Sequence, residues 1–348
     1  MNRNKYSNHK IAWFPDKLQS FRDDQVIPPI YVRVKPTNRC CHKCFFCVYN
    51  PEFSRMHETI QPADELPTAK ALELLDDFKA MGVKAVTYSG GGEPLMHPDI
   101  VTIFRHTLDQ GIDLSILTNA QLLSNERADL LADAKWIRVS ADYCNPEMFE
   151  RTRGDKRMYQ TLIDNIAAFA QRKRAGDFGV NFIVSRQNAR QVYDAAAFFK
   201  DLGVDNIRFS PMWTPDFYHY HLPIEGMVGD QLSHARNELQ DTNYHVYDSY
   251  RIVPEVNDRV YTRCYVMQTI PVVGADGSVY ACHNKAYTTE GRIGSINERS
   301  FRQLWESDET KEFFRTFNAQ QLCRHQCSND AKNVFINDLI NCQGDNFV

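Results

Sequence analysis

The chain has 348 residues, of which 43% are hydrophobic and 24% are charged, and its formal net charge is −4. This composition is typical of a globular protein with one large domain, or a large and a small one. A slightly acidic chain offers no basic field to attract nucleic acid or an anionic membrane, so we expect neither partner. No segment predicts a signal peptide or a membrane span, which favours a cytoplasmic protein.

The chain contains ten cysteines, which is many for this length. Without an export signal, we expect reduced thiols that act as metal ligands rather than disulfides.

Short apolar runs alternate with amphipathic helical patterns from Ile30 to about Met212. The predicted strands are Tyr31–Val34, Ala85–Ser89, Asp113–Leu117, Trp136–Ser140, Gly179–Val184 and Asn206–Ser210. The predicted helices are Leu66–Met81, Asp99–Gln110, Asn125–Ala134, Tyr159–Arg174 and Ala189–Leu202. Successive β–α units predict a parallel sheet, either a partial barrel or a doubly wound sheet, with reactive groups at the C-terminal ends of the strands.

Four cysteines, Cys40, Cys41, Cys44 and Cys47, follow the first predicted strand directly. Two registers are open, C-x3-C-x2-C through Cys40 and C-x2-C-x2-C through Cys41. Adjacent side chains in an extended segment point opposite ways, so we expect Cys40 and Cys41 not to bind the same centre. A structural zinc usually has four ligands in two separated pairs, whereas three thiolates on one loop suit a soft centre with an open position.

Two motifs resemble the radical S-adenosylmethionine enzymes: the C-x3-C-x2-C spacing with Phe46 before its last cysteine, and "GGGEP" after the second strand. "ILTNA" and "RVSAD", at the third and fourth strand ends, also fit that family's layout. The resemblance implies a partial (β/α)6 TIM-like barrel, with Cys40, Cys44 and Cys47 holding a [4Fe–4S] cluster and Cys41 spare. A zinc or ferredoxin-type site through Cys41 would leave "GGGEP" unexplained.

The same resemblance implies residues that bind S-adenosylmethionine. Glu93 offers an acceptor for its ammonium group, Thr118 and Ser140 lie near its amino-acid end, and Arg153 is a candidate for its carboxylate. The full expected set is Phe46, Gly91, Gly92, Glu93, Thr118, Ser140 and Arg153.

Beyond Pro211 the pattern becomes irregular over Met212–Tyr265, with one predicted helix near Gly229–Gln240. "TIPVVGADGSVYACHN" predicts a β-hairpin, and Phe301–Phe317 predicts a helix. We therefore expect a small α+β domain after the barrel. The expected division is an N-terminal extension (1–29), the barrel (30–212), a connecting and substrate-proximal segment (213–260) and the C-terminal domain (261–348).

A second set of cysteines lies in the C-terminal part: Cys264, Cys282, Cys323 and Cys327. Their arrangement resembles the auxiliary "twitch" or SPASM extensions of the same family, which implies a second [4Fe–4S] cluster with no open iron. A structural zinc is the alternative. Cys342 could replace one of the four ligands, but we expect an ordinary buried thiol.

The resemblance implies that a 5′-deoxyadenosyl radical abstracts hydrogen from the substrate. We expect a small hydroxylated metabolite such as a sugar or aminocyclitol, and oxidation, epimerisation or elimination as the outcome. The alternative is a peptide- or protein-modifying maturase, which the short segment before the first strand disfavours. A third hypothesis is an iron–sulfur protein that only carries electrons.

Cys144, just past the fourth strand, could supply a hydrogen atom, although a free cysteine is more often a small buried hydrophobe. The expected partners are a small-molecule substrate and an electron donor such as flavodoxin or ferredoxin.

Overall fold

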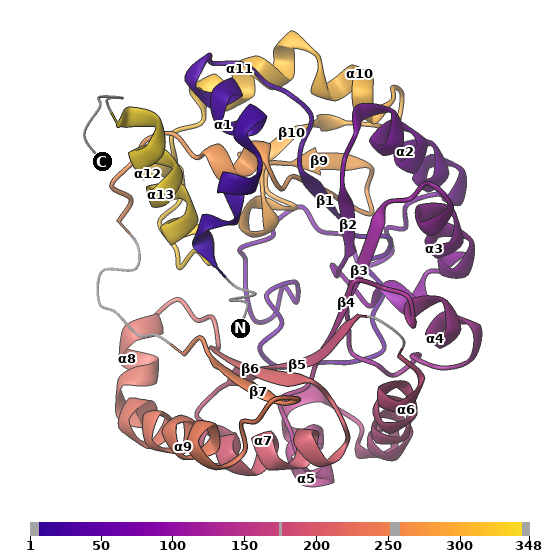
Figure 1. The fold of residues 1–348 in the computed structure, drawn as a ribbon, viewed down its shortest axis with the longest axis vertical. Coiled ribbons are helices and arrows are strands. Elements are labelled where there is room, and N and C mark those ends of the chain that lie inside the picture. Colours follow the sequence, from indigo (N-terminus) through magenta and orange to yellow (C-terminus); the bar gives the residue numbers. More distant parts are fainter. Residues whose placement is uncertain (1–6, 174–175, 251–257, 343–348) are drawn as a thin grey trace.

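The structure is a computed structural model that describes residues 7–173, 176–250 and 258–342. One sheet of ten strands curves around the centre of the molecule in the order β10-β9-β8-β1-β2-β3-β4-β5-β6-β7 (Figure 1). Strands β1 to β7 pair in parallel throughout. They are β1 (Tyr31–Val34), β2 (Ala85–Tyr88), β3 (Asp113–Thr118), β4 (Trp136–Ser140), β5 (Asp177–Val184), β6 (Asn206–Pro211) and β7 (His245–Asp248).

Helices cover the outer side of this curved sheet (Figure 1). In chain order they are α2 (Thr68–Met81), α3 (Ile100–Asp109), α4 (Asn125–Leu131), α5 (Pro146–Arg153), α6 (Tyr159–Arg172), α7 (Val192–Asp201), α8 (Phe217–His221) and α9 (Glu225–Glu238). The partial TIM-like barrel that the sequence predicts is confirmed, and all six predicted strands are present within two residues of their expected bounds.

The connecting segment after β6 is more regular than predicted. It contains α8, α9 and the additional parallel strand β7, so the expectation of an irregular stretch with one helix is wrong. Strand β7 has only four residues, "HVYD", and their polar ends hide the strand pattern in the sequence.

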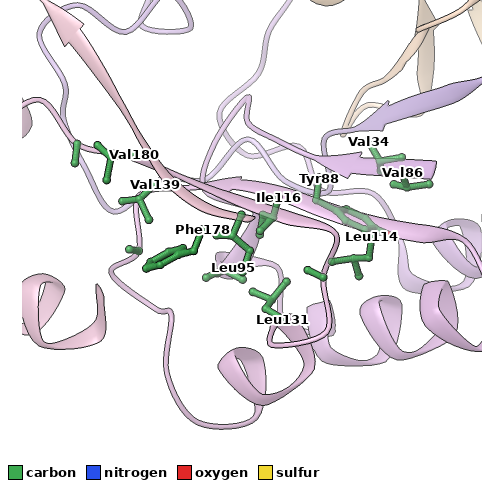
Figure 2. Close-up of a cluster of buried hydrophobic side chains, with 14 of the residues drawn as sticks. Val34, Val86, Tyr88, Leu95, Leu114, Ile116, Leu131, Val139, Phe178 and Val180 are labelled. Atoms are coloured by element: carbon green, nitrogen blue, oxygen red, sulfur yellow. The ribbon is translucent and has the colours of Figure 1, made fainter. Parts of the chain in front are cut away.

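The core lies between the sheet and its helices, as Figure 2 shows. Val34, Val86, Tyr88 and Ile116 are at most 2% exposed and belong to one buried cluster. Because side chains alternate along a strand, their neighbours Arg33, Thr87 and Ser115 point to the inner face, where Thr87 and Ser115 hydrogen-bond each other at 2.9 Å. The inner face is therefore polar.

The C-terminal part extends the same sheet. Strands β8 (Val272–Val273) and β9 (Ser278–Tyr280) form the predicted hairpin, β10 (Arg292–Ser295) follows, and β8 pairs in parallel with β1. The single helix predicted over Phe301–Phe317 is wrong, because Ser307 accepts a hydrogen bond from Thr310 N and caps a new helix. The helices are α10 (Phe301–Trp305), α11 (Asp308–Thr316), α12 (Ala319–Leu322) and α13 (Asp330–Asn341). Since one sheet runs through both parts, the domain boundaries stay predictions.

Two terminal segments lie beside the opening between the sheet edges. Helix α1 (Pro15–Arg22) and α13 lie side by side there (Figure 1), and Phe21, Tyr265 and Ile336 share a buried cluster. Among the residues that the structure describes, no helix is long and apolar enough to cross a membrane.

Candidate functional site

The cysteine loop between β1 and α2 rests on α5, the helix that follows β4. Lys43 N donates to Arg153 O at 2.9 Å, and Phe45 N donates to Thr152 O at 3.4 Å. Within the loop, Cys47 N donates to Cys44 O at 3.2 Å. These bonds hold the three predicted ligands at the C-terminal end of the barrel, where the fold places reactive groups.

The thiols lie close to one another and to two hydrogen-bond donors. Burial raises the pKa of Cys44 to about 12, and the charges of Cys47 and Cys40 add to the rise. The Arg153 Nη1 atom lies 3.4 Å from Cys44 Sγ, and the Asn119 side-chain amide lies 3.9 Å from Cys40 Sγ. Donors at these positions stabilise thiolates.

Cys41 lies closer to Cys40 than the sequence predicts. The amide of Asn119 reaches both sulfurs, at 3.3 Å from Cys41 Sγ and 3.9 Å from Cys40 Sγ. The expectation that the two side chains point apart is therefore wrong, and the choice of Cys40 as the ligand stays a prediction.

The glycines of "GGGEP" let two loops approach each other closely. Gly92 N donates to Thr37 O at 3.0 Å, and Glu93 N donates to Arg39 O at 2.8 Å. A Cβ atom at Gly92 would lie 2.0 Å from Arg39 O, and one at Gly91 would lie 1.8 Å from Asn38 Oδ1. Gly91 and Gly92 thus fix the cysteine loop against the end of β2.

We expect Gly92→Ala to lower the free energy of unfolding by about 1–3 kcal/mol, because the new methyl group overlaps the backbone of Arg39. Gly229→Ala is the matched control. A Cβ atom at Gly229 in α9 meets nothing within 4 Å, so this change should stabilise the protein by about 0.5–1 kcal/mol. Chemical denaturation measures both. Equal effects of the two substitutions would contradict the close approach.

Glu93 lies buried between β2 and β3, 3% exposed. Its carboxylate accepts from Thr118 Oγ1 at 2.6 Å, from Asn119 N at 2.6 Å and from Leu95 N at 3.1 Å. Burial raises its pKa, and these three bonds oppose the rise. A carboxylate has about four acceptor positions, so capacity for one further donor remains.

Arg153 forms a buried ion pair. Its Nη2 atom lies 2.6 Å from Asp142 Oδ2, with the two side chains 5% and 0% exposed. The guanidinium also lies 5.5 Å from the ring centre of Phe46, which brings two of the predicted cofactor-binding residues together. Ser140, the last residue of β4, is half-buried and pairs in register with Asn181.

A buried polar network joins the cysteine loop to the C-terminal part. Lys35 Nζ lies 2.5 Å from both Tyr49 Oη and Gly90 O. Tyr49 Oη lies 3.3 Å from His283 Nδ1, and the Tyr49 ring stacks on His57 at 4.4 Å. Because Tyr49 is two residues after Cys47 and His283 directly follows Cys282, this network connects the two cysteine sets.

The structure brings the four C-terminal cysteines together. Burial, together with a charge on Cys327, raises the pKa of Cys282 to about 12 and that of Cys323 to about 11. The pKa of Cys264 is raised by burial and then by charges on the other three. Backbone N–H groups of Met267 and of Asn284 lie close enough to Cys264 and Cys282 to bond their sulfurs.

Two other cysteines differ from these sets. Cys342, the residue after α13, is exposed, so the expectation of a buried thiol is wrong. The Cys144 thiol lies 3.7 Å from Gln191 Oε1, and its backbone carbonyl accepts from Tyr159 Oη at 3.2 Å. Neither contact involves the cysteine loop, so the hydrogen-donor role of Cys144 stays a prediction.

The donor chemistry fits two iron–sulfur clusters. The first set offers three thiols beside amide and guanidinium donors, and the second offers four thiols with backbone N–H donors. Within residues 7–173, 176–250 and 258–342, no three His, Cys, Asp or Glu side chains are arranged to hold a single metal ion.

A family model described as the Radical SAM superfamily matches residues 34–212, just over half of the chain. The chain belongs to this superfamily. A second model, described as an iron–sulfur cluster-binding domain (SPASM), matches residues 264–328 and includes all four C-terminal cysteines of the predicted set. The expected cofactors are thereby confirmed: radical SAM proteins bind a [4Fe–4S] cluster and S-adenosylmethionine, and the second domain brings additional iron–sulfur.

Relatives of this radical SAM protein differ in what their names say they act on. PqqA peptide cyclase of Bradyrhizobium diazoefficiens is 26% identical over 245 residues, which cover 70% of this chain and 58% of that protein. A probable GTP 3′,8-cyclase of Methanocaldococcus jannaschii is 29% identical over 237 residues, covering 64% of this chain and 74% of that protein. The chain thus spans little more than half the length of the peptide cyclase.

A solved structure supports the fold. SuiB of Streptococcus suis, bound to its precursor peptide SuiA, matches with a TM-score of 0.63 and 17% identity, over 87% of this chain and 70% of that one.

Sequence reasoning missed Asn119, Asp142, Lys35 and Tyr49. Asn119 and Asp142 had a usable signal. Asn119 directly follows β3 within "ILTNA", and Asp142 ends "RVSAD", two residues after β4. Lys35 and Tyr49 had none, since their partners Gly90 and His283 lie far along the chain.

Proposed function

We propose that this protein is a radical SAM enzyme that abstracts a hydrogen atom from a small hydroxylated metabolite, giving oxidation, epimerisation or elimination. When bound, the cluster supplies one electron that cleaves S-adenosylmethionine to the 5′-deoxyadenosyl radical. The observation that carries the proposal is the junction of three thiols with the Gly91–Glu93 loop and the end of β3. An electron carrier has no need for such an amino-acid pocket.

The residues of the chain take defined roles in this proposal. Cys40, Cys44 and Cys47 hold the cluster, and the remaining acceptor position of Glu93 takes the ammonium group of the cofactor. Arg153 receives the cofactor carboxylate with its guanidinium fixed by Asp142, and Phe46 lies against it. Thr118 and Ser140 line the amino-acid end from β3 and β4.

Two observations support a small substrate. The inner face of the barrel is polar, and the Methanocaldococcus relative is named for GTP. The relative named for a peptide supports the alternative, a peptide-modifying maturase. We further propose a cytoplasmic location and an electron donor of the flavodoxin or ferredoxin type.

The test is 5′-deoxyadenosine formation by the reconstituted, reduced protein under anaerobic conditions. We expect S-adenosylmethionine alone to give slow release of 5′-deoxyadenosine. A protein that only carries electrons would release none. Pools of deuterated hydroxylated metabolites should accelerate the release and transfer deuterium to 5′-deoxyadenosine. Acceleration by peptide pools alone would favour the maturase instead.

A further inference from the structure

The turn that follows β3 is strained and is held in place by hydrogen bonds on two sides. Ala120 is fully buried and has a φ of +65°, in the left-handed region that costs free energy for a residue with a side chain. Its N–H donates to Thr118 Oγ1 at 3.0 Å. From helix α6, Asn165 Nδ2 donates to Ala120 O and to Gln121 O, both at 3.0 Å. Backbone strain persists where the surrounding structure fixes it, and it clusters at functional sites.

This turn sets the orientation of the Asn119 side chain. Asn119 is 5% exposed, and its Oδ1 accepts from Gln121 N at 2.9 Å. Because the carbonyl oxygen of the amide bonds Gln121, the two N–H donors of the amide face the other way. There Nδ2 lies 3.3 Å from Cys41 Sγ and 3.9 Å from Cys40 Sγ. The amide is therefore aimed at the cysteine loop by the backbone of its own turn.

Asn119 also contacts the residue that is proposed to receive the ammonium group of the cofactor. Its backbone N–H donates to Glu93 Oε2 at 2.6 Å, and Thr118 Oγ1 donates to Glu93 Oε1 at 2.6 Å. The main chain of Asn119 thus bonds the carboxylate, while its side chain bonds sulfur. Since the two contacts use different atoms, a substitution can remove the amide without removing the bond to Glu93.

A purely local role explains only part of this arrangement. Asparagine is common in turns because its side chain bonds its own backbone, and the bond from Gln121 N is of that kind. Such a cap does not require the N–H groups to meet two sulfurs, nor does it require support from α6. The sulfur contacts therefore call for a second role.

We propose that Asn119 is a positioning residue for the first cluster, the one assigned to Cys40, Cys44 and Cys47, and that its amide raises the reduction potential of this cluster. A hydrogen-bond donor at a ligand sulfur stabilises the form with more negative charge, and reduction adds one electron. The amide reaches both adjacent sulfurs, so the inference holds for either register. It rests on the proposed function, because it assumes a cluster on this loop.

The test is a redox titration of the reconstituted full chain, followed by electron paramagnetic resonance. Asn119→Leu removes the amide without adding a charge. We expect one-electron reduction of the first cluster to become about tenfold less favourable, which is a shift of about 59 mV to more negative potential. The auxiliary cluster in the same sample is the internal reference and should keep its potential.

Asn165→Leu is the matched control, because it removes an amide that supports the same turn through Ala120 O and Gln121 O. It should lower the free energy of unfolding and leave the potential of the first cluster near the wild-type value. Should Asn119→Leu fail to fold, Asn119→Asp keeps an acceptor for Gln121 N and replaces the donor with an oxygen. It should shift the potential in the same direction.

Three results would overturn the inference. They are an unchanged potential of the first cluster in the Asn119 variants, an equal shift of both clusters, and an equal shift in Asn165→Leu. The last would mean that the potential follows the integrity of the turn rather than the amide.

Cys44→Ala separates this inference from the proposed function, because it should remove the signal of the first cluster. If both cluster signals remain in Cys44→Ala, the assignment of a cluster to this loop fails, and the proposed function fails with it. If one signal disappears and Asn119→Leu does not shift the potential of that signal, the role of Asn119 alone fails.

Discussion

Cys44→Ala is expected to reduce the release of 5′-deoxyadenosine to background, because three thiolates are the minimum that holds a cubane cluster with one open iron. Cys40→Ala should do the same, whereas Cys41→Ala should leave release largely intact. The comparison of Cys40→Ala with Cys41→Ala is a strict test of the register, since both sulfurs lie beside the Asn119 amide. Both variants lose a thiol from the same loop, so they serve as matched controls for folding.

The measurement is anaerobic release of 5′-deoxyadenosine after reconstitution, with iron content determined in parallel. The two predicted clusters correspond to about eight iron atoms, and loss of the first should leave about four. If Cys41→Ala were inactive and Cys40→Ala active, the register assignment would be reversed.

Arg153→Ala is expected to lower the free energy of unfolding by about 3–5 kcal/mol, because it leaves the carboxylate of Asp142 buried without its partner. Asp142 is fully buried, and burial already raises its pKa against the opposing charge of Arg153. The same change removes the donor 3.4 Å from Cys44 Sγ. We therefore expect both reduced stability and weaker binding of S-adenosylmethionine.

Two controls distinguish these effects in denaturation experiments. Arg157→Ala breaks an exposed pair with Asp155 on the same side of the barrel and should change stability little. Adding Asp142→Asn to Arg153→Ala removes the stranded charge and should recover part of the lost stability without restoring cofactor binding. Recovery of cofactor binding by the double variant would contradict the role of Arg153 as the carboxylate receptor.

The sequence predicted the barrel well because its signals are local. Each of β1 to β6 is a short run with buried apolar residues that ends near small or polar residues, and hydrophobic alternation is sufficient to find such strands. Strand β7 was missed since only Val246 of its four residues is buried and aliphatic. The break between α10 and α11 was missed because a single serine cap, Ser307, outweighs a continuous helical pattern.

Contacts between distant segments account for what the sequence did not show. In the Lys35–Tyr49–His283 network, Tyr49 and His283 are 234 residues apart, and no local pattern encodes their contact. The exposed Cys342 was misjudged because cysteine is usually buried, whereas the position after α13 faces outward. The predicted ligands, by contrast, came from the resemblance of both cysteine motifs to a known family, which chose between the two registers that spacing left open.

The most direct test of the account is electron paramagnetic resonance of the reduced, reconstituted protein before and after S-adenosylmethionine is added. The account predicts that one of two cluster signals changes, that Cys44→Ala abolishes this change, and that Cys323→Ala preserves it. A wild-type spectrum that does not respond to the cofactor, or a response that survives Cys44→Ala, would contradict the claim that the N-terminal cysteines present an open iron to S-adenosylmethionine.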